Sequence, residues 1–315
     1  MLNTPRPYYL EQAEQGPPVS YPRESHPDTY YSGPIQDTYA ERSKAYLQFV
    51  LQNPLDQDQR TMWRELIAMM AGGEAHEGKI FQVLNKINAR LDCSDFSMHS
   101  VLRLVYQFDP NRKVSTPNGK VIAPHHPPSR DALDAAKETI LHFKYWPDEP
   151  GIDSMCTWTE NHQILFASAG YLAGQIYPDA VFFNSGETGR QKMATNKPRI
   201  LRWMDLRFRS GFSEWLSHVY YEEDLAPLLS LHDLCEDKEI RTKAAQIIDL
   251  MLLDVVLNQY KGLLGCTHGR SYEKQKKWAA GESTITMTKL LFGRGIYTNC
   301  SSMSLYTMST PYENE

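Results

Sequence analysis

The sequence has little that would tie it to a membrane or to nucleic acid. Among its 315 residues there is no uncharged apolar run near the roughly 20 residues that a membrane-spanning helix needs. The 33 basic side chains are fewer than the 38 acidic ones, so the net charge is -5 and there is no basic excess for a polyphosphate backbone. These deficits predict neither a membrane span nor a nucleic-acid partner.

The N-terminal stretch also lacks the apolar core of a secretory signal. Taken as given, the sequence predicts a cytoplasmic protein, with a secreted or periplasmic location if the N-terminus is incomplete. The five cysteines are scattered and show no C-x-x-C spacing, which predicts thiols. Cys266 and His268 lie two residues apart but lack a second pair of ligands, so we expect neither a metal nor another cofactor.

Strand signals and fixed-period repeats are scarce, whereas helical periodicity is abundant. Apolar residues recur three and four apart in ten segments separated by short breakers, which predicts a nearly all-α protein. Ser129 is expected to cap one of these helices. The segments are 37–52, 60–72, 78–91, 96–108, 130–146, 160–177, 199–216, 224–235, 240–259 and 284–295.

Two of these segments are apolar on most faces, around Leu165 to Ile176 and Ala244 to Leu257, which predicts that they lie inside an outer layer of helices. Inner and outer helices together favour an α/α toroid, a complete or incomplete α/α barrel, over residues 35–315. Residues 1–34 are rich in Pro and Tyr and lack periodicity, which predicts a disordered arm. The abrupt C-terminal end suggests either truncation of this domain or a divergent tail.

Three polar groupings are candidates for a functional site. The first is Asn161-His162, at the head of an apolar helix and directly after a long loop rich in aromatic and acidic residues. A structural interpretation is also available, in which Thr159 caps the helix, Glu160 occupies its favourable first turn and His162 is a half-buried polar residue.

The second grouping is an arginine-rich helix followed by His218 and the pair Tyr220-Tyr221, and the third is a glycine-broken loop. The second grouping offers an anion clamp beside a proton-transfer group. The third, irregular backbone directly after an apolar helix, is typical of a binding rim. The structural alternative is that the arginines lie on an exposed helix face and form ion pairs with nearby acidic side chains. The arginines are Arg199, Arg202, Arg207 and Arg209, and the loop presents Cys266, His268, Arg270, Tyr272 and Lys274.

The segment ENHQILFASAGYLAG, followed by the arginine helix and HVYYEEDLAPLL, resembles the α/α-toroid polysaccharide lyases of the alginate lyase and glucuronan lyase type. In that type an Asn-Asn-His motif opens an inner helix, and an Arg precedes a His-x-Tyr stretch that runs into a Pro-Leu helix. The match covers about residues 155 to 232, and Glu160 replaces the first Asn of the motif.

The resemblance implies β-elimination on a uronate-containing polysaccharide or oligosaccharide. Such an enzyme neutralises the carboxylate beside C5, which implies roles for Asn161, His162 and one of Arg207 or Arg209. Tyr220 or Tyr221 would act as base and acid, with an arginine lowering the tyrosine pKa, when the C5 hydrogen and the C4 oxygen share a face. His162 would be the base when they lie on opposite faces. The residues expected to bind sugars are Trp158, Trp203, Trp215, Glu160, His218, His268, Arg270 and Tyr272.

Two other functions stay open at this point. A toroid glycoside hydrolase would use two carboxylates, about 6.5 to 9.5 Å apart for inversion, chosen from Asp153, Glu160, Glu214 and Glu223. A non-catalytic carbohydrate-binding or protein-binding helical protein would need no such pair, and the N-terminal arm would suit docking. Neither the polymer, nor endo or exo action, nor the oligomeric state follows from the sequence.

Overall fold

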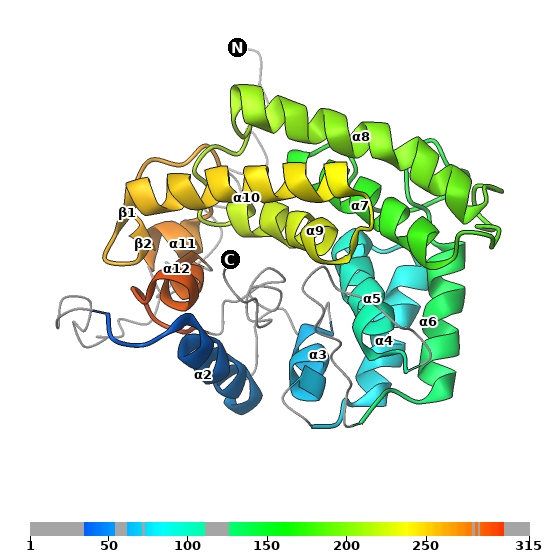
Figure 1. The fold of residues 1–315 in the computed structure, drawn as a ribbon, viewed down its shortest axis with the longest axis horizontal. Coiled ribbons are helices and arrows are strands. Elements are labelled where there is room, and N and C mark those ends of the chain that lie inside the picture. The colour runs from blue at the N-terminus through cyan, green and yellow to red at the C-terminus, as the bar shows by residue number, and fades with distance from the viewer. Residues whose placement is uncertain are drawn as a thin grey trace, which may run out of the picture.

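The computed structural model describes residues 35–53, 62–70, 73–110, 126–278, 281–282 and 284–298. Within these ranges the chain is nearly all helical, which confirms the all-α prediction (Figure 1). The predicted arm and Cys300 lie outside the described residues. The helices are α2 (Tyr39–Gln52), α3 (Trp63–Met70), α4 (Glu77–Asn88), α5 (Ser94–Phe108), α6 (Arg130–His142), α7 (Glu160–Ile176), α8 (Gly189–Ser210), α9 (Tyr220–Leu234), α10 (Lys238–Asn258), α11 (Glu273–Lys277) and α12 (Thr284–Phe292).

Strands are almost absent from the described chain. Strands β1 (Gln259–Tyr260) and β2 (Leu263–Leu264) form a small antiparallel hairpin in which Gln259 pairs with Leu264 and Tyr260 with Leu263. The hairpin lies at the end of α10 (Figure 1). None of the helices in the described ranges is long and apolar enough to cross a bilayer. Cys93, Cys156, Cys235 and Cys266 are thiols, as expected.

Local sequence sets where the helices begin. Thr38 caps α2 and Thr188 caps α8, each in a capping box with the residue three positions on. Ser129 accepts a hydrogen bond from the N–H of Ala132 and so caps α6, as predicted. Helix α8 begins ten residues before the expected segment at Arg199, since it continues through Pro198.

Helix α7 is the central helix of the molecule. Fifteen of its 17 residues are buried, and it packs against α5, α8 and α9. Its close approach to α8 depends on Gly170 and Gly174, since a Cβ at Gly174 would lie 2.5 Å from the carbonyl oxygen of Gly189. The prediction of an interior helix is therefore confirmed for this segment.

The same prediction is wrong for α10, which lies on the surface. It buries one side, including Ile247 and Met251, against α8 and α9. Its other side leaves Leu253 and Leu257 exposed, the latter at 71%. The second buried helix is instead α9, with 12 of 15 residues buried despite its first-turn acids. Hydrophobic content alone predicted the wrong one of these two helices to be buried, because α10 is apolar on a side that no described residue covers.

The first and last described helices meet. Helix α12 packs on α2, and Arg42 of α2 donates hydrogen bonds to the carbonyl oxygens of Leu290 (2.8 Å) and Leu291 (3.0 Å) at the end of α12. Arg42 is 7% exposed. The buried guanidinium thus satisfies carbonyls that a helix end leaves without an intrahelical partner.

Candidate functional site

A cavity of about 450 Å³ lies where the N-terminal turns of α5, α7 and α9 meet the segment that leads into α11. The positive ends of three helix dipoles therefore surround one space, which favours a negatively charged ligand. The lining residues are Asp92, Cys93, Phe96, Cys156, Thr159, Asn161, His162, Val219, Tyr220, Glu223, Arg270, Tyr272 and Gln275. Five of the residues expected in a lyase site are brought together here, Asn161, His162, Tyr220, Arg270 and Tyr272, and so is the hydrolase candidate Glu223.

His162 is held by a buried carboxylate. Its Nδ1 lies 2.5 Å from Oδ2 of Asp95, a residue of the first turn of α5 that is fully buried. The ring of Phe96 packs edge-on against the imidazole, with the centroids 5.2 Å apart. Burial raises the pKa of Asp95, while the hydrogen bond from His162 opposes that rise. Because Asp95 engages Nδ1, Nε2 is the nitrogen left for a ligand in the cavity.

Asn161 presents a donor without an acceptor. Its Oδ1 accepts a hydrogen bond from the hydroxyl of Thr159 (2.7 Å), which orients the amide, and its Nδ2 is buried with no partner. Thr159 precedes α7 but does not cap it through its side chain, contrary to the structural interpretation of this segment. A buried amide N–H without an acceptor is costly, and a ligand oxygen in the cavity would satisfy it.

Arg270 and two tyrosines form one wall of the cavity. The guanidinium of Arg270 lies 4.2 Å from the ring centroid of Tyr220 and donates to Oε1 of Glu214 (2.7 Å) and to the hydroxyl of Tyr272 (3.0 Å). The hydroxyls of Tyr220 and Tyr272 also bond to each other. Among the residues that line this cavity, Arg270 is the only Lys or Arg. It is therefore the cation positioned to meet an anionic ligand.

The pKa of Tyr220 differs from the expectation. Burial, followed by the hydrogen bond with Tyr272, raises the Tyr220 pKa well above its usual value, and Arg270 only partly opposes this. The predicted lowering by an arginine is outweighed because the phenolate would be both desolvated and beside a second tyrosine. Tyr220 is therefore a proton donor at neutral pH.

Glu223 adds a second acidic proton to the cavity. Its Oε2 is enclosed without a partner, and burial together with Glu222, Asp95 and Glu214 raises the Glu223 pKa well above its usual value. The raised pKa favours the protonated carboxyl, which can donate a hydrogen bond or a proton.

The loop that carries Arg270 is fixed by a pair of histidines outside the cavity. His218 stacks on His268 with the ring centroids 3.8 Å apart, and its Nε2 bonds to Ser271 Oγ at 2.6 Å. His268 Nδ1 donates to the carbonyl oxygen of Leu216 (2.5 Å). The predicted sugar-binding residues His218 and His268 therefore hold the loop in place instead of lining the cavity.

Glu160 and Arg207 form a structural pair away from the cavity. The Glu160 carboxylate bonds to the guanidinium of Arg207 and accepts the backbone N–H groups of Ser213 (2.7 Å) and Glu214 (3.0 Å). These contacts tie the start of α7 to the end of α8. A carboxylate suits this position because it accepts hydrogen bonds from an arginine and two backbone donors.

The remaining predicted site residues also lie outside the cavity. Arg209 is exposed and forms an ion pair with Asp205, as expected if the arginines lie on an exposed, ion-paired helix face. Tyr221 is buried and donates to Asp254 Oδ2 (3.0 Å). Trp158 is 75% exposed, and the buried Trp203 donates its N–H to the carbonyl oxygen of Glu160. Of the two tyrosines Tyr220 lines the cavity and Tyr221 does not, and the arginine in the lining is Arg270, not Arg207 or Arg209.

Comparison with known proteins adds no relative. No protein-family model, curated protein or solved structure matches this chain. The described residues also contain no group of three or more His, Cys, Asp and Glu side chains arranged to hold a metal ion.

Proposed function

We propose that this protein is a polysaccharide lyase of the α/α-toroid type that cleaves a uronate-containing chain by β-elimination. The observation that carries the proposal is the convergence of Asn161, His162, Tyr220 and Arg270 on one cavity ringed by three helix N-termini. The contact between α2 and α12 supports a closed, toroid-like course of the chain.

The carboxylate of the uronate would be bound by Arg270 and by the unpaired Nδ2 of Asn161. Removing the C5 proton next to a carboxylate builds negative charge on the carboxylate oxygens, and these two donors stabilise that charge. The helix dipoles contribute in the same direction. The requirement for carboxylate neutralisation is thereby met by residues already placed in the cavity.

The proton transfers divide between two residues. Nε2 of His162, oriented by Asp95, takes the C5 proton; the C5–H electrons form the C4–C5 double bond, and the C4–O bond breaks. Tyr220, whose raised pKa keeps the phenol protonated, donates its proton to the departing oxygen. With base and acid on different residues, we expect substrates whose C5 hydrogen and C4 oxygen lie on opposite faces, such as guluronate, galacturonate or iduronate.

The direct test is ultraviolet absorbance of the unsaturated uronate after mixing the protein with alginate, polygalacturonate, glucuronan, hyaluronan, chondroitin, dermatan and heparan. We expect absorbance to grow on an opposite-face polymer. His162→Ala and Asn161→Ala should each lower the rate by about 10²-fold or more. Gln163→Ala is the matched control, because Gln163 is the exposed neighbour on α7 and does not line the cavity.

A hydrolase is the second candidate, and the Glu223 carboxyl in the cavity, whose raised pKa favours the protonated form, supports it. The partner carboxylate would be Glu214, which lies behind the cavity wall and accepts a hydrogen bond from Arg270. New reducing ends without ultraviolet absorbance, lost in Glu223→Gln, would replace the lyase proposal with this one. Absence of both signals on every polymer would refute catalysis on these substrates.

A further inference from the structure

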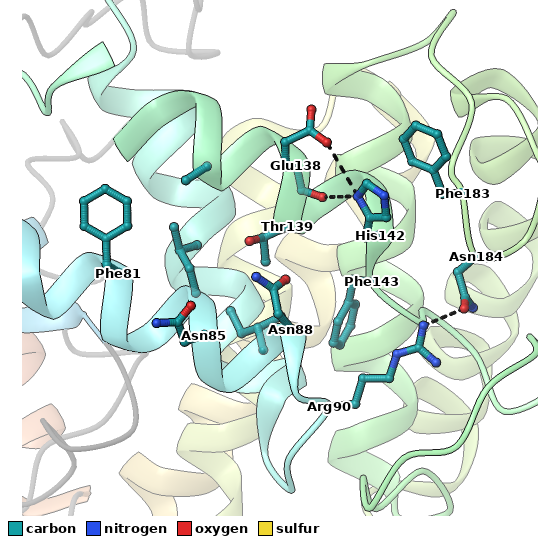
Figure 2. Close-up of a pocket in the computed structure, with 13 residues that line it drawn as sticks. Phe81, Asn85, Asn88, Arg90, Glu138, Thr139, His142, Phe143, Phe183 and Asn184 are labelled. Atoms are coloured by element: carbon teal, nitrogen blue, oxygen red, sulfur yellow. Dashed lines mark hydrogen bonds and ion pairs between the residues drawn. The ribbon is translucent and has the colours of Figure 1, made fainter. Parts of the chain in front are cut away.

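A second cavity, of about 550 Å³, lies between α4 and α6 and is separate from the proposed catalytic cavity. The residues around it are drawn in Figure 2. None of them was singled out by the sequence; they come from α4 and α6, from the residues that follow these two helices, and from the segment before α8. We call this cavity the α4–α6 groove.

Aromatic rings mark the ends of the α4–α6 groove. Phe81 lies at one end and Phe183 at the other, with Asn85, Asn88 and Thr139 between them (Figure 2). Phe183 is 62% exposed and stacks on the ring of His142, with the centroids 4.2 Å apart and the planes 11° from parallel. An exposed aromatic ring held flat by a second ring is a rigid platform for an apolar ligand face.

The middle of the groove offers hydrogen-bonding groups that the described protein does not use. No hydrogen bond from the side chains of Asn85, Asn88 or Thr139 is found among the described residues, although Thr139 is almost fully buried. Each amide has both donors and an acceptor, and each hydroxyl has one of each. Such groups complement vicinal hydroxyls, which also donate and accept.

The charges that line the groove are balanced. Arg90 donates to Oδ1 of Asn184 (2.6 Å) and to the carbonyl oxygen of Pro150, and Glu138 lies 3.7 Å from Nδ1 of His142. Because Arg90 is already hydrogen-bonded and Glu138 carries the opposite charge, the lining of the groove does not favour an anionic ligand. The ligand indicated by this lining is neutral, hydroxyl-rich and apolar on one face.

We propose that the α4–α6 groove binds neutral sugar units of a carbohydrate chain. Its amides and hydroxyl bond to the sugar hydroxyls, and Phe81 and Phe183 pack against the C–H faces of the rings. A volume of about 550 Å³ falls in the range of small-molecule sites, which accommodates a disaccharide. The loop between α4 and α5 separates the two cavities, with Arg90 lining the groove and Asp92 lining the catalytic cavity. The groove is thus placed to bind carbohydrate independently of the elimination chemistry.

The test is isothermal titration of the full chain with four neutral disaccharides: cellobiose, maltose, mannobiose and chitobiose. At least one should bind, and Asn88→Ala and Phe81→Ala should each weaken its binding by about tenfold. Gln82→Ala is the matched control, because Gln82 is exposed on the same helix but does not line the groove. This control should bind as the unmodified protein does.

The catalytic cavity provides the second control. Arg270→Ala should leave disaccharide binding unchanged, so the groove can be confirmed even if the lyase proposal fails. Failure of all four disaccharides to bind would overturn the groove proposal. Binding that is lost in Arg270→Ala but kept in Asn88→Ala would also overturn it, because the sugar would then occupy only the catalytic cavity.

Discussion

At the scale of single residues, His99 shows how burial fixes the protonation state of a side chain. His99 lies on α5, 1% exposed, and its Nε2 donates to the carbonyl oxygen of Leu165 (3.1 Å). Its Nδ1 is buried without a partner. A second ring proton would therefore be placed on a nitrogen that has no acceptor. Burial, aided by the charge of Arg103, lowers the His99 pKa to about 4.

This lowered pKa predicts a loss of stability in acid. In the unfolded chain His99 binds a proton below its ordinary value of about 6.5, while the folded protein keeps it neutral down to about pH 4. The unfolded state binds more protons in this window. His99 should therefore lower the free energy of unfolding by about 2.5 kcal/mol between pH 7 and pH 4.5.

The measurement is urea unfolding at both pH values for the unmodified protein and His99→Gln. Glutamine keeps an N–H donor for Leu165 but does not titrate. The unmodified protein should lose about 2.5 kcal/mol more than the variant over this range. An equal loss in both proteins would show that His99 is protonated in the folded state.

At the scale of elements, glycines allow the close approach of α7 to α8. At Gly174 a Cβ would lie 2.5 Å from the carbonyl oxygen of Gly189 and 3.1 Å from Cβ of Lys192. The first contact is with backbone, which cannot rotate away. The start of α7 carries Asn161 and His162, so this packing also positions the site.

We expect Gly174→Ala to destabilise the protein by about 1–3 kcal/mol through overpacking. Gly78→Ala is the contrasting change, since Gly78 lies in the first turn of α4 with nothing within 4 Å of the added Cβ. That variant should gain about 0.4–1 kcal/mol, because alanine reduces the freedom of the unfolded chain. Thermal unfolding compares the two, and equal stability of both variants would refute the close approach at Gly174.

Periodicity predicted the helices well and their burial less well. The ten expected segments correspond to α2 through α10 and α12, but the segment expected from Arg199 begins ten residues after the true start of α8 at Gly189. Helix α10 was expected inside because composition does not record which side is covered. A short helix such as α11, with three lysines, carries no apolar period to detect.

The site was predictable in part. Asn161-His162 and Tyr220 stood out because polar groups at the head of apolar helices are conspicuous in sequence. Asp95 was missed, since one acidic residue in a helix gives no pattern, and its role depends on a contact 67 positions away. The presence of Arg270 in the cavity lining and the absence of Arg207 from it also depend on the fold, because Glu160 engages Arg207 only when α7 and α8 are packed.

At the scale of the whole molecule, the two ends of the described chain are joined by Arg42. Its guanidinium bonds to two carbonyls at the end of α12 and to Asp37 (Oδ1 at 3.0 Å), while the hydroxyl of Tyr297 donates to its backbone carbonyl (2.8 Å). In a course of helices that returns to its start, such a contact determines whether the first and last helices unfold together.

Arg42→Ala should therefore destabilise both α2, which carries Arg42, and α12, whose carbonyls Arg42 binds. We expect a loss of about 2–4 kcal/mol in the free energy of unfolding, because the carbonyls of Leu290 and Leu291 lose their buried partner. Hydrogen exchange should show reduced protection in α2 and α12 together, with α7 little changed. Arg209→Ala, which removes only the exposed pair with Asp205, should change stability by less than about 0.5 kcal/mol. If α12 keeps its protection in Arg42→Ala, the two helices are independent units, and the toroid-like closure that supports the lyase proposal is not a source of stability.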